Sequence, residues 1–192
     1  MRTILSSILA TAILMGAQPS MAEDQSHVEK LKATKKCEGC DLIGSNLTGM
    51  NLQGADLYRA RLSGADLTGA DLQGAYLRRT DLKGANLTNA NLTGVNLTDA
   101  NLKNANLTAA DLYRTRLSGA DLTGADLQGA YLRGTDLKGA NLTNANLTGV
   151  NLTDANLKNA NLTAADLTEA NLEYATICKT TMPDGTVRNN NC

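Results

Sequence analysis

A leucine recurs at every fifth position from Leu42 to Leu172 without an exception, and Ile177 continues the series to a twenty-eighth unit. A small residue stands two positions before each of these central residues and is alanine in 20 of the 28 units. The position between them is asparagine or aspartate in 23 units. A period of five fits neither an α-helix nor a β-strand, because it would spread the leucines over all faces of either element. The chain must therefore turn regularly around a narrow axis, as β-solenoids do.

The repeating unit resembles the motif of the pentapeptide-repeat family. Runs such as Ala65-Asp66-Leu67-Thr68-Gly69 carry this resemblance, which covers about 140 of the 192 residues. It implies an all-β fold, a right-handed quadrilateral β-helix with one pentapeptide per side and four pentapeptides per coil. Twenty-eight units over residues 41–177 then give about seven coils. With coils spaced like β-strands, at ~4.8 Å, the rod should be roughly 35 Å long.

Residues 1–22 have the features of a secretory signal peptide. Arg2 provides the positive start, an apolar run follows over residues 4–15, and small residues lead to Ala22. The apolar run is well short of the ~20 residues that span a bilayer. We therefore expect cleavage after Ala22 and a periplasmic or secreted protein with no membrane span.

The segments that flank the repeats are expected to cover the two ends of the rod. Residues 23–40 form a leader and cap, in which Ser26 and Glu29 make a capping box for a short helix through Val28 and Leu31. Residues 178–192 form a C-terminal cap with a strong turn signal at residues 182–185. A solenoid needs such caps because an open edge invites strand addition.

Four cysteines follow the signal peptide: Cys37, Cys40, Cys178 and Cys192. An even number in an exported chain indicates disulfides, and the sequence alone allows three pairings. The rod that the family resemblance implies places one pair at each end, which leaves Cys37 with Cys40 and Cys178 with Cys192. A redox-active C-x-x-C is the alternative for the first pair, but no thioredoxin-like pattern surrounds it. Two isolated thiols make an incomplete zinc site, so we predict no metal and no cofactor.

Residues 57–111 and 112–166 are near-identical copies that differ at two positions. Their offset of eleven pentapeptides places equivalent residues on adjacent sides of the rod, a quarter turn apart and about 13 Å along its axis. Each copy carries outward tyrosines and arginines, a composition typical of protein-binding surfaces. We call these residues the Tyr/Arg patch: Tyr58, Arg59, Arg61, Tyr76, Arg78 and Arg79 in the first half, and Tyr113, Arg114, Arg116, Tyr131 and Arg133 in the second.

The coil period predicts that Tyr58 stacks on Arg78 and Tyr113 on Arg133, with cation–π contact. A partner that binds the Tyr/Arg patch would see two copies that spiral around the rod. The alternative is a solvated ladder that simply replaces asparagine and threonine.

Another side carries a rank of threonines at coil spacing, comprising Thr48, Thr68, Thr88, Thr108, Thr148 and Thr168 and interrupted by Gln128. This array is similar to the surfaces of ice-binding β-helices, although those usually carry paired ranks. Good β-propensity on an exposed strand is the alternative explanation.

The composition restricts function further. The chain has one histidine, His27, so enzymes that need histidine pairs or triads are excluded, and no nucleophile, base and orienting group can be named together. Residues 41–177 hold 14 acidic and 11 basic side chains, whereas the DNA-mimic members of the family that bind topoisomerase have strongly acidic faces. The near-balanced charge also gives no reason to expect nucleic acid. We therefore favour a non-enzymatic exported scaffold that binds an unidentified protein, as a monomer or as an end-to-end dimer.

Overall fold

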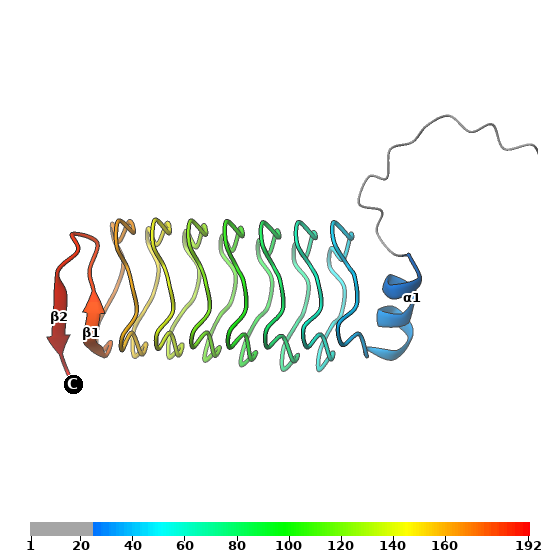
Figure 1. The fold of residues 1–192 in the computed structure, drawn as a ribbon, viewed down its shortest axis with the longest axis horizontal. Coiled ribbons are helices and arrows are strands. Elements are labelled where there is room, and N and C mark those ends of the chain that lie inside the picture. Colours follow the sequence, from blue (N-terminus) through cyan, green and yellow to red (C-terminus); the bar gives the residue numbers. More distant parts are fainter. Residues whose placement is uncertain (1–24) are drawn as a thin grey trace, which may run out of the picture.

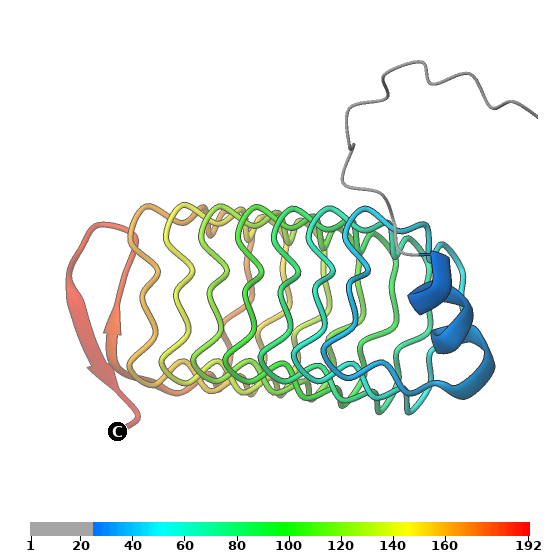
Figure 2. The same ribbon diagram turned by 45° about the vertical axis from the view of Figure 1, so that its right-hand side comes forward.

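The computed structural model describes residues 25–192, which form a rod with a helix at one end and a hairpin at the other (Figures 1 and 2). Helix α1 is Gln25–Thr34, strand β1 is Ile177–Thr181 and strand β2 is Val187–Asn190. The repeats lie between them. The predicted signal peptide, residues 1–22, lies outside the described residues.

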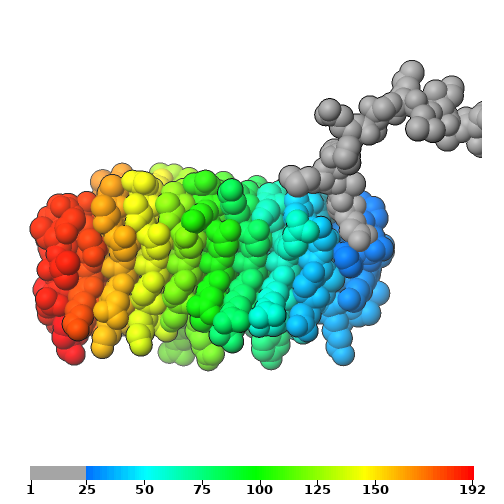
Figure 3. Space-filling model, in the orientation of Figure 1, coloured from blue at the N-terminus to red at the C-terminus, as the bar shows by residue number. Residues whose placement is uncertain are grey.

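One coil comprises four pentapeptide units. The residue before each central leucine forms a parallel bridge with its equivalent in the next coil, as in Asp41 with Arg61 and Asn46 with Asp66, and the series runs to Asn161 with Thr181. The N–H of Leu47 donates to the carbonyl of Asp66 at 2.8 Å. Four ladders of such bonds therefore run along the rod, and the side chains of successive coils form slanted ridges on its surface (Figure 3).

A tight turn follows each central leucine. The carbonyl of Leu62 accepts the N–H of Ala65 at 3.0 Å, and Gly64 between them has a φ of +66°. This left-handed conformation at the third turn position suits glycine. The N–H of Thr68 donates to Oδ1 of Asp66 at 3.0 Å, and the same contact recurs in most units. The recurring asparagine and aspartate therefore fix the turns.

The interior contains columns of leucine and small residues, and Leu42 to Leu162 are each at most 1% exposed. Burial of one leucine side chain stabilises the fold by about 2 kcal/mol. Where threonine replaces the small alanine, its hydroxyl is satisfied. Thr115 donates to the carbonyl of Leu92 at 2.7 Å, and Thr135 to that of Leu112 at 3.0 Å. One leucine and one small residue fill each side, so the core needs no phenylalanine or tryptophan.

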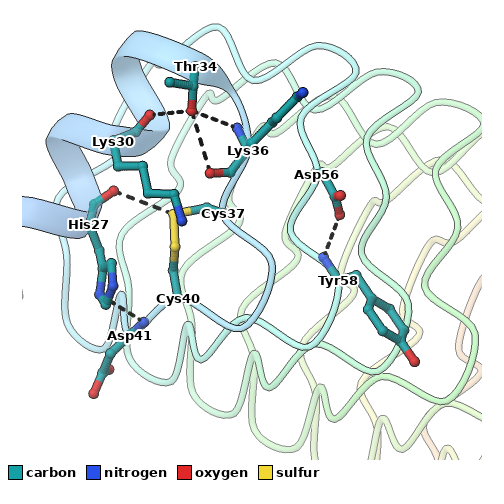
Figure 4. Close-up of a disulfide and its surroundings, with 9 residues drawn as sticks. All are labelled: His27, Lys30, Thr34, Lys36, Cys37, Cys40, Asp41, Asp56 and Tyr58. Atoms are coloured by element: carbon teal, nitrogen blue, oxygen red, sulfur yellow. Dashed lines mark hydrogen bonds between the residues drawn. A yellow bond between two sulfur atoms is a disulfide. The ribbon is translucent and has the colours of Figure 1, made fainter.

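Helix α1 packs on the first coil through Val28 and Leu31, which are buried in the same core. The helix begins at Gln25, so Ser26 lies in its first turn and not before it as the capping box predicted. The N–H of Asp41 donates to Nδ1 of His27 at 3.3 Å and ties the helix to the rod (Figure 4). Within residues 25–192, no helix has the length and apolar character needed to cross a membrane.

Both ends carry a disulfide. Cys37 is bonded to Cys40 beside α1 (Figure 4), with their Cα atoms 5.1 Å apart. Cys178 in β1 is bonded to Cys192, with their Cα atoms 4.9 Å apart. No cysteine in the described part of the chain is free.

The C-terminal tail forms a hairpin that covers only part of the last coil. Strands β1 and β2 pair antiparallel, with a register shift between Cys178 and Thr180. The hairpin begins at Ile177, and the two preceding central residues, Leu167 and Leu172, remain only partly buried. The hairpin turns within residues 182–185, as the sequence predicts, since the N–H of Gly185 donates to the carbonyl of Met182 at 2.9 Å. Strand β1 also bonds to the preceding coil, where the N–H of Leu162 donates to the carbonyl of Thr181 at 2.8 Å.

Candidate functional site

The first half of the Tyr/Arg patch lies on neighbouring coils along one side of the rod. Asp56 bridges to Tyr76, and the N–H of Arg59 donates to the carbonyl of Arg78 at 3.2 Å. These ladder bonds place Tyr58 and Arg59 next to Arg78. Tyr76 is 61% exposed, a high value for a large aromatic side chain.

A shallow groove of about 400 Å³ lies between these side chains. Its lining combines two aromatic rings with charged and amide groups: Glu38, Asp56, Tyr58, Tyr76, Arg78 and Asn96. An open surface with these chemical groups can accept a side chain or a short segment of another protein.

The arginines of the patch form exposed ion pairs. Arg78 lies 3.4 Å from Asp99, and Arg79 contacts the same carboxylate at 3.6 Å. In the second half, Arg133 lies 3.3 Å from Asp154. All of these side chains are about half exposed, so each pair contributes roughly 0–1 kcal/mol to stability. A partner's carboxylates can therefore replace them at little cost.

The expected contacts between tyrosine and arginine of successive coils are replaced by contacts within a coil. The guanidinium of Arg59 lies over the Tyr58 ring, 5.0 Å from its centre, and Arg114 lies over Tyr113 at 5.1 Å. The turn after Leu57 puts Arg59 in a left-handed conformation, with a φ of +55°, and its side chain returns over the preceding ring. Arg78 instead turns toward Asp99.

The second half of the patch repeats the first on the adjacent side. The N–H of Arg114 donates to the carbonyl of Arg133 at 3.1 Å, and Asp111 bridges to Tyr131. Tyr131 is 49% exposed. Tyr131 is therefore exposed on its side of the rod much as Tyr76 is on the adjacent side.

Arg61 and Arg116 lie apart from these groups. Arg61 is on the side next to Tyr58, where it pairs with Asp41 at 2.7 Å. Arg116 bridges to Asn96, so it lies on the side of Tyr76, two coils farther along. The structure thus brings nine of the eleven patch residues into two groups and separates these two arginines from them.

The threonine rank uses its hydroxyls within the chain. Thr68, Thr88 and Thr148 each donate to Oδ1 of the residue two positions earlier, at 2.6–2.7 Å. The hydroxyl and N–H of Thr68 hold the pKa of Asp66 below its ordinary value of 3.8. These hydroxyls are therefore committed to turns, which favours the structural explanation of the rank.

Three further aspartates also have a lowered pKa. The hydroxyl and N–H of Thr168 lower that of Asp166, and those of Thr186 lower that of Asp184. Burial alone would raise the pKa of Asp121, but hydrogen bonds from Thr123 and Lys103 outweigh it. These carboxylates are ionised at neutral pH.

Carboxylates that the sequence did not single out accompany the patch. Asp99 pairs with Arg79, its equivalent one coil earlier in the chain. That separation was a usable signal, because the coil period places such residues side by side. Glu38 in the groove also lies one coil before Tyr58, but it precedes the first full unit of the repeats, so the repeat pattern did not single it out.

The repeats match a known protein family. The family model described as pentapeptide repeats matches in eight copies, within residues 36–74, 60–99, 70–108, 100–139, 110–149 and 145–182. No curated protein matches the chain.

Solved structures of pentapeptide repeat proteins are similar to the chain. HetL from the cyanobacterium Nostoc, involved in heterocyst differentiation regulation, is 36% identical over 80% of this chain and 81% of its own, with a TM-score of 0.46. A protein from the Arabidopsis thaliana thylakoid lumen is 29% identical over 49% of this chain and 66% of its own, with a TM-score of 0.48. QnrB1, a plasmid-mediated fluoroquinolone resistance protein, is 19% identical over 81% and 92%, with a TM-score of 0.42.

Proposed function

Because this chain belongs to the pentapeptide repeat family, we propose that it is a non-enzymatic, exported scaffold that binds a protein partner through the Tyr/Arg patch. The observation that carries this proposal is the patch itself, present twice on a rod whose other outward positions are mostly asparagine, threonine and glycine. Within residues 25–192, no group of three or more histidine, cysteine or acidic side chains could hold a metal ion.

The chemistry of the patch suits a protein partner. Tyrosine and arginine are enriched where proteins bind, because both combine apolar area with hydrogen-bond donors. Tyr76 and Tyr131 already lie in solvent, so a partner can cover them without unfolding the rod. The exposed pair between Arg133 and Asp154 offers a guanidinium to the carboxylates of a partner.

The two halves of the patch define how a partner can bind. They face adjacent sides of the rod, so one flat surface cannot cover both. A partner that contacts both halves must wrap around a corner, or two partner molecules bind separately. Binding at both halves by one partner would raise its avidity above that of either half.

We also propose that the mature protein, formed by cleavage after Ala22, is a monomer and lies in the periplasm or outside the cell. Its fold is a right-handed rod of about seven coils. The disulfides at Cys37 and Cys178 support this location, because such bonds persist in oxidising compartments. Mass spectrometry of the protein from its native host should find a chain that starts at Glu23 with both disulfides. Recovery of the chain in the cytosol with free thiols would contradict export and favour a DNA mimic.

The partner-binding role can be tested by neutralising four arginines of the patch. The variant that changes Arg59, Arg78, Arg114 and Arg133 to glutamine should keep its thermal stability, because it loses only exposed pairs. Affinity purification from the native host should then lose any partner that the unchanged chain recovers.

A matched control removes the same number of positive charges elsewhere. It changes Lys83, Lys103, Lys138 and Lys158 to glutamine, all of them exposed and outside the patch. This variant should still recover the partner. Equal recovery of the partner by the arginine variant and the unchanged chain would show that the arginines of the patch have no role in binding.

A further inference from the structure

The C-terminal end of the rod leaves core side chains uncovered. At the N-terminal end Leu42, Leu47 and Leu52 are fully buried beneath α1. At the C-terminal end Leu167 and Leu172 are only partly buried, although their counterparts one coil earlier are fully buried. The end of the core is thus exposed on two of the four sides of the last coil.

Some of the backbone N–H and carbonyl groups on the same two sides are also without partners among the described residues. In the preceding coil the N–H groups of Leu147 and Leu152 donate to the carbonyls of Asp166 and Asn171, both at 2.8 Å. One coil later no described residue accepts the equivalent N–H groups, which belong to Leu167, Glu169, Leu172 and Tyr174. The carbonyls of Ala165 and Ala170 likewise receive no hydrogen bond from residues 25–192.

We call residues 165–174 the open edge. Its donors alternate with a period of two, like those of an edge strand, so an extended segment can pair with either side of it. The hairpin follows the open edge at the same end of the rod (Figure 1), but it provides no acceptor for these four N–H groups. Tyr174, at the end of the open edge, is 73% exposed.

The open edge is also acidic. Asp166, Glu169 and Glu173 lie along it, and none of them forms an ion pair with another residue of the described chain. Thr168 donates its hydroxyl to Asp166 at 2.6 Å, which keeps that carboxylate ionised. A bound segment must therefore bring positive charge as well as backbone carbonyls and apolar side chains.

A second copy of the chain fits this edge poorly. In-register stacking of the rods would need the first coil of the second copy, but α1 lies on that end with Val28 and Leu31 packed against it. Two open edges brought together would oppose the same three carboxylates, and like charges in contact are unfavourable.

We propose that the open edge binds an extended segment of a different protein, with lysine or arginine beside apolar residues, by addition of a strand. The carbonyls of this segment accept the N–H groups of Leu167 and Glu169, or those of Leu172 and Tyr174. Its apolar side chains cover the end of the leucine columns, and its basic side chains pair with the carboxylates. This site is separate from the Tyr/Arg patch and does not depend on it.

The test uses the full mature protein and a short synthetic peptide of alternating lysine and valine. Hydrogen exchange measured with and without the peptide should show protection at the amides of Leu167 and Glu169, or at those of Leu172 and Tyr174. A peptide with glutamate in place of lysine should give no protection. Protection that falls elsewhere, binding of both peptides alike, or no binding of the lysine peptide would overturn the proposal.

Charge reversal on the edge provides the second measurement. Changing Glu169 and Glu173 to lysine should weaken binding of the lysine peptide about tenfold, because two exposed pairs are replaced by repulsion. The matched control Glu29→Lys on α1 should leave the affinity unchanged. Equal effects of the two changes would contradict the proposal, as would sedimentation analysis that shows a stable dimer blocking the edge.

Discussion

The two copies differ at a turn position, and this difference allows a quantitative test of the fold. Arg79 has a φ of +59°, and its equivalent in the second copy, Gly134, has a φ of +67°. A side chain in this left-handed region costs about 1–2 kcal/mol, partly offset by the greater freedom that glycine loses on folding, about 0.5–1 kcal/mol. The exposed pair of Arg79 with Asp99 adds back only a few tenths of a kcal/mol.

The two reciprocal substitutions should therefore change the free energy of unfolding in opposite directions. Arg79→Gly should raise the free energy of unfolding by roughly 0.5 kcal/mol. Gly134→Arg should lower it by about 1 kcal/mol, since the added Cβ would also lie 3.4 Å from Cγ of Arg114. Urea denaturation with the disulfides intact measures both values. A loss of stability for Arg79→Gly, or no loss for Gly134→Arg, would refute the assignment of backbone strain to this turn.

Leu112→Ala should lower the free energy of unfolding by about 3 kcal/mol. Leu172→Ala, in the same leucine column, should lower it by only about 1 kcal/mol, because Leu172 is partly exposed. Urea denaturation of both variants measures the difference. The four aspartates with lowered pKa should stabilise the fold above their unfolded-state pKa near 3.8. Thermal melts should thus be level from pH 7 to about 5 and fall below about 4, since these groups must then protonate. Cys192→Ser should free the hairpin, because its disulfide with Cys178 closes only the terminal loop. Amide hydrogen exchange should become faster in β2 and stay unchanged in the middle coils.

The coil could be predicted in detail because one physical pattern repeats. A leucine and a small residue at fixed spacing determine the interior, and the asparagine or aspartate between them fixes each turn, as Asp66 does with Thr68. The coil period then predicts which residues are neighbours. This reasoning placed the two halves of the Tyr/Arg patch on adjacent sides.

The details that the sequence did not predict depend on side-chain direction and on the ends. Tyr58 and Arg78 are neighbours in the ladder, but the left-handed turn directs Arg59 over the ring and leaves Arg78 to pair with Asp99. The tail after Ile177 has a turn signal at residues 182–185 but no repeat, so no spacing rule could show how its two strands would lie beside the open edge.

The proposed role of the rod is to hold the Tyr/Arg patch in place for contact with a partner protein. The direct measurement replaces Tyr76 or Tyr131 with a photo-crosslinking amino acid in the native host, with Thr88 and Thr148 on the threonine rank as matched positions. We expect the same crosslinked partner from both tyrosine positions and none from the threonine positions. Equal crosslinks from the threonine rank, or none from either tyrosine, would contradict it.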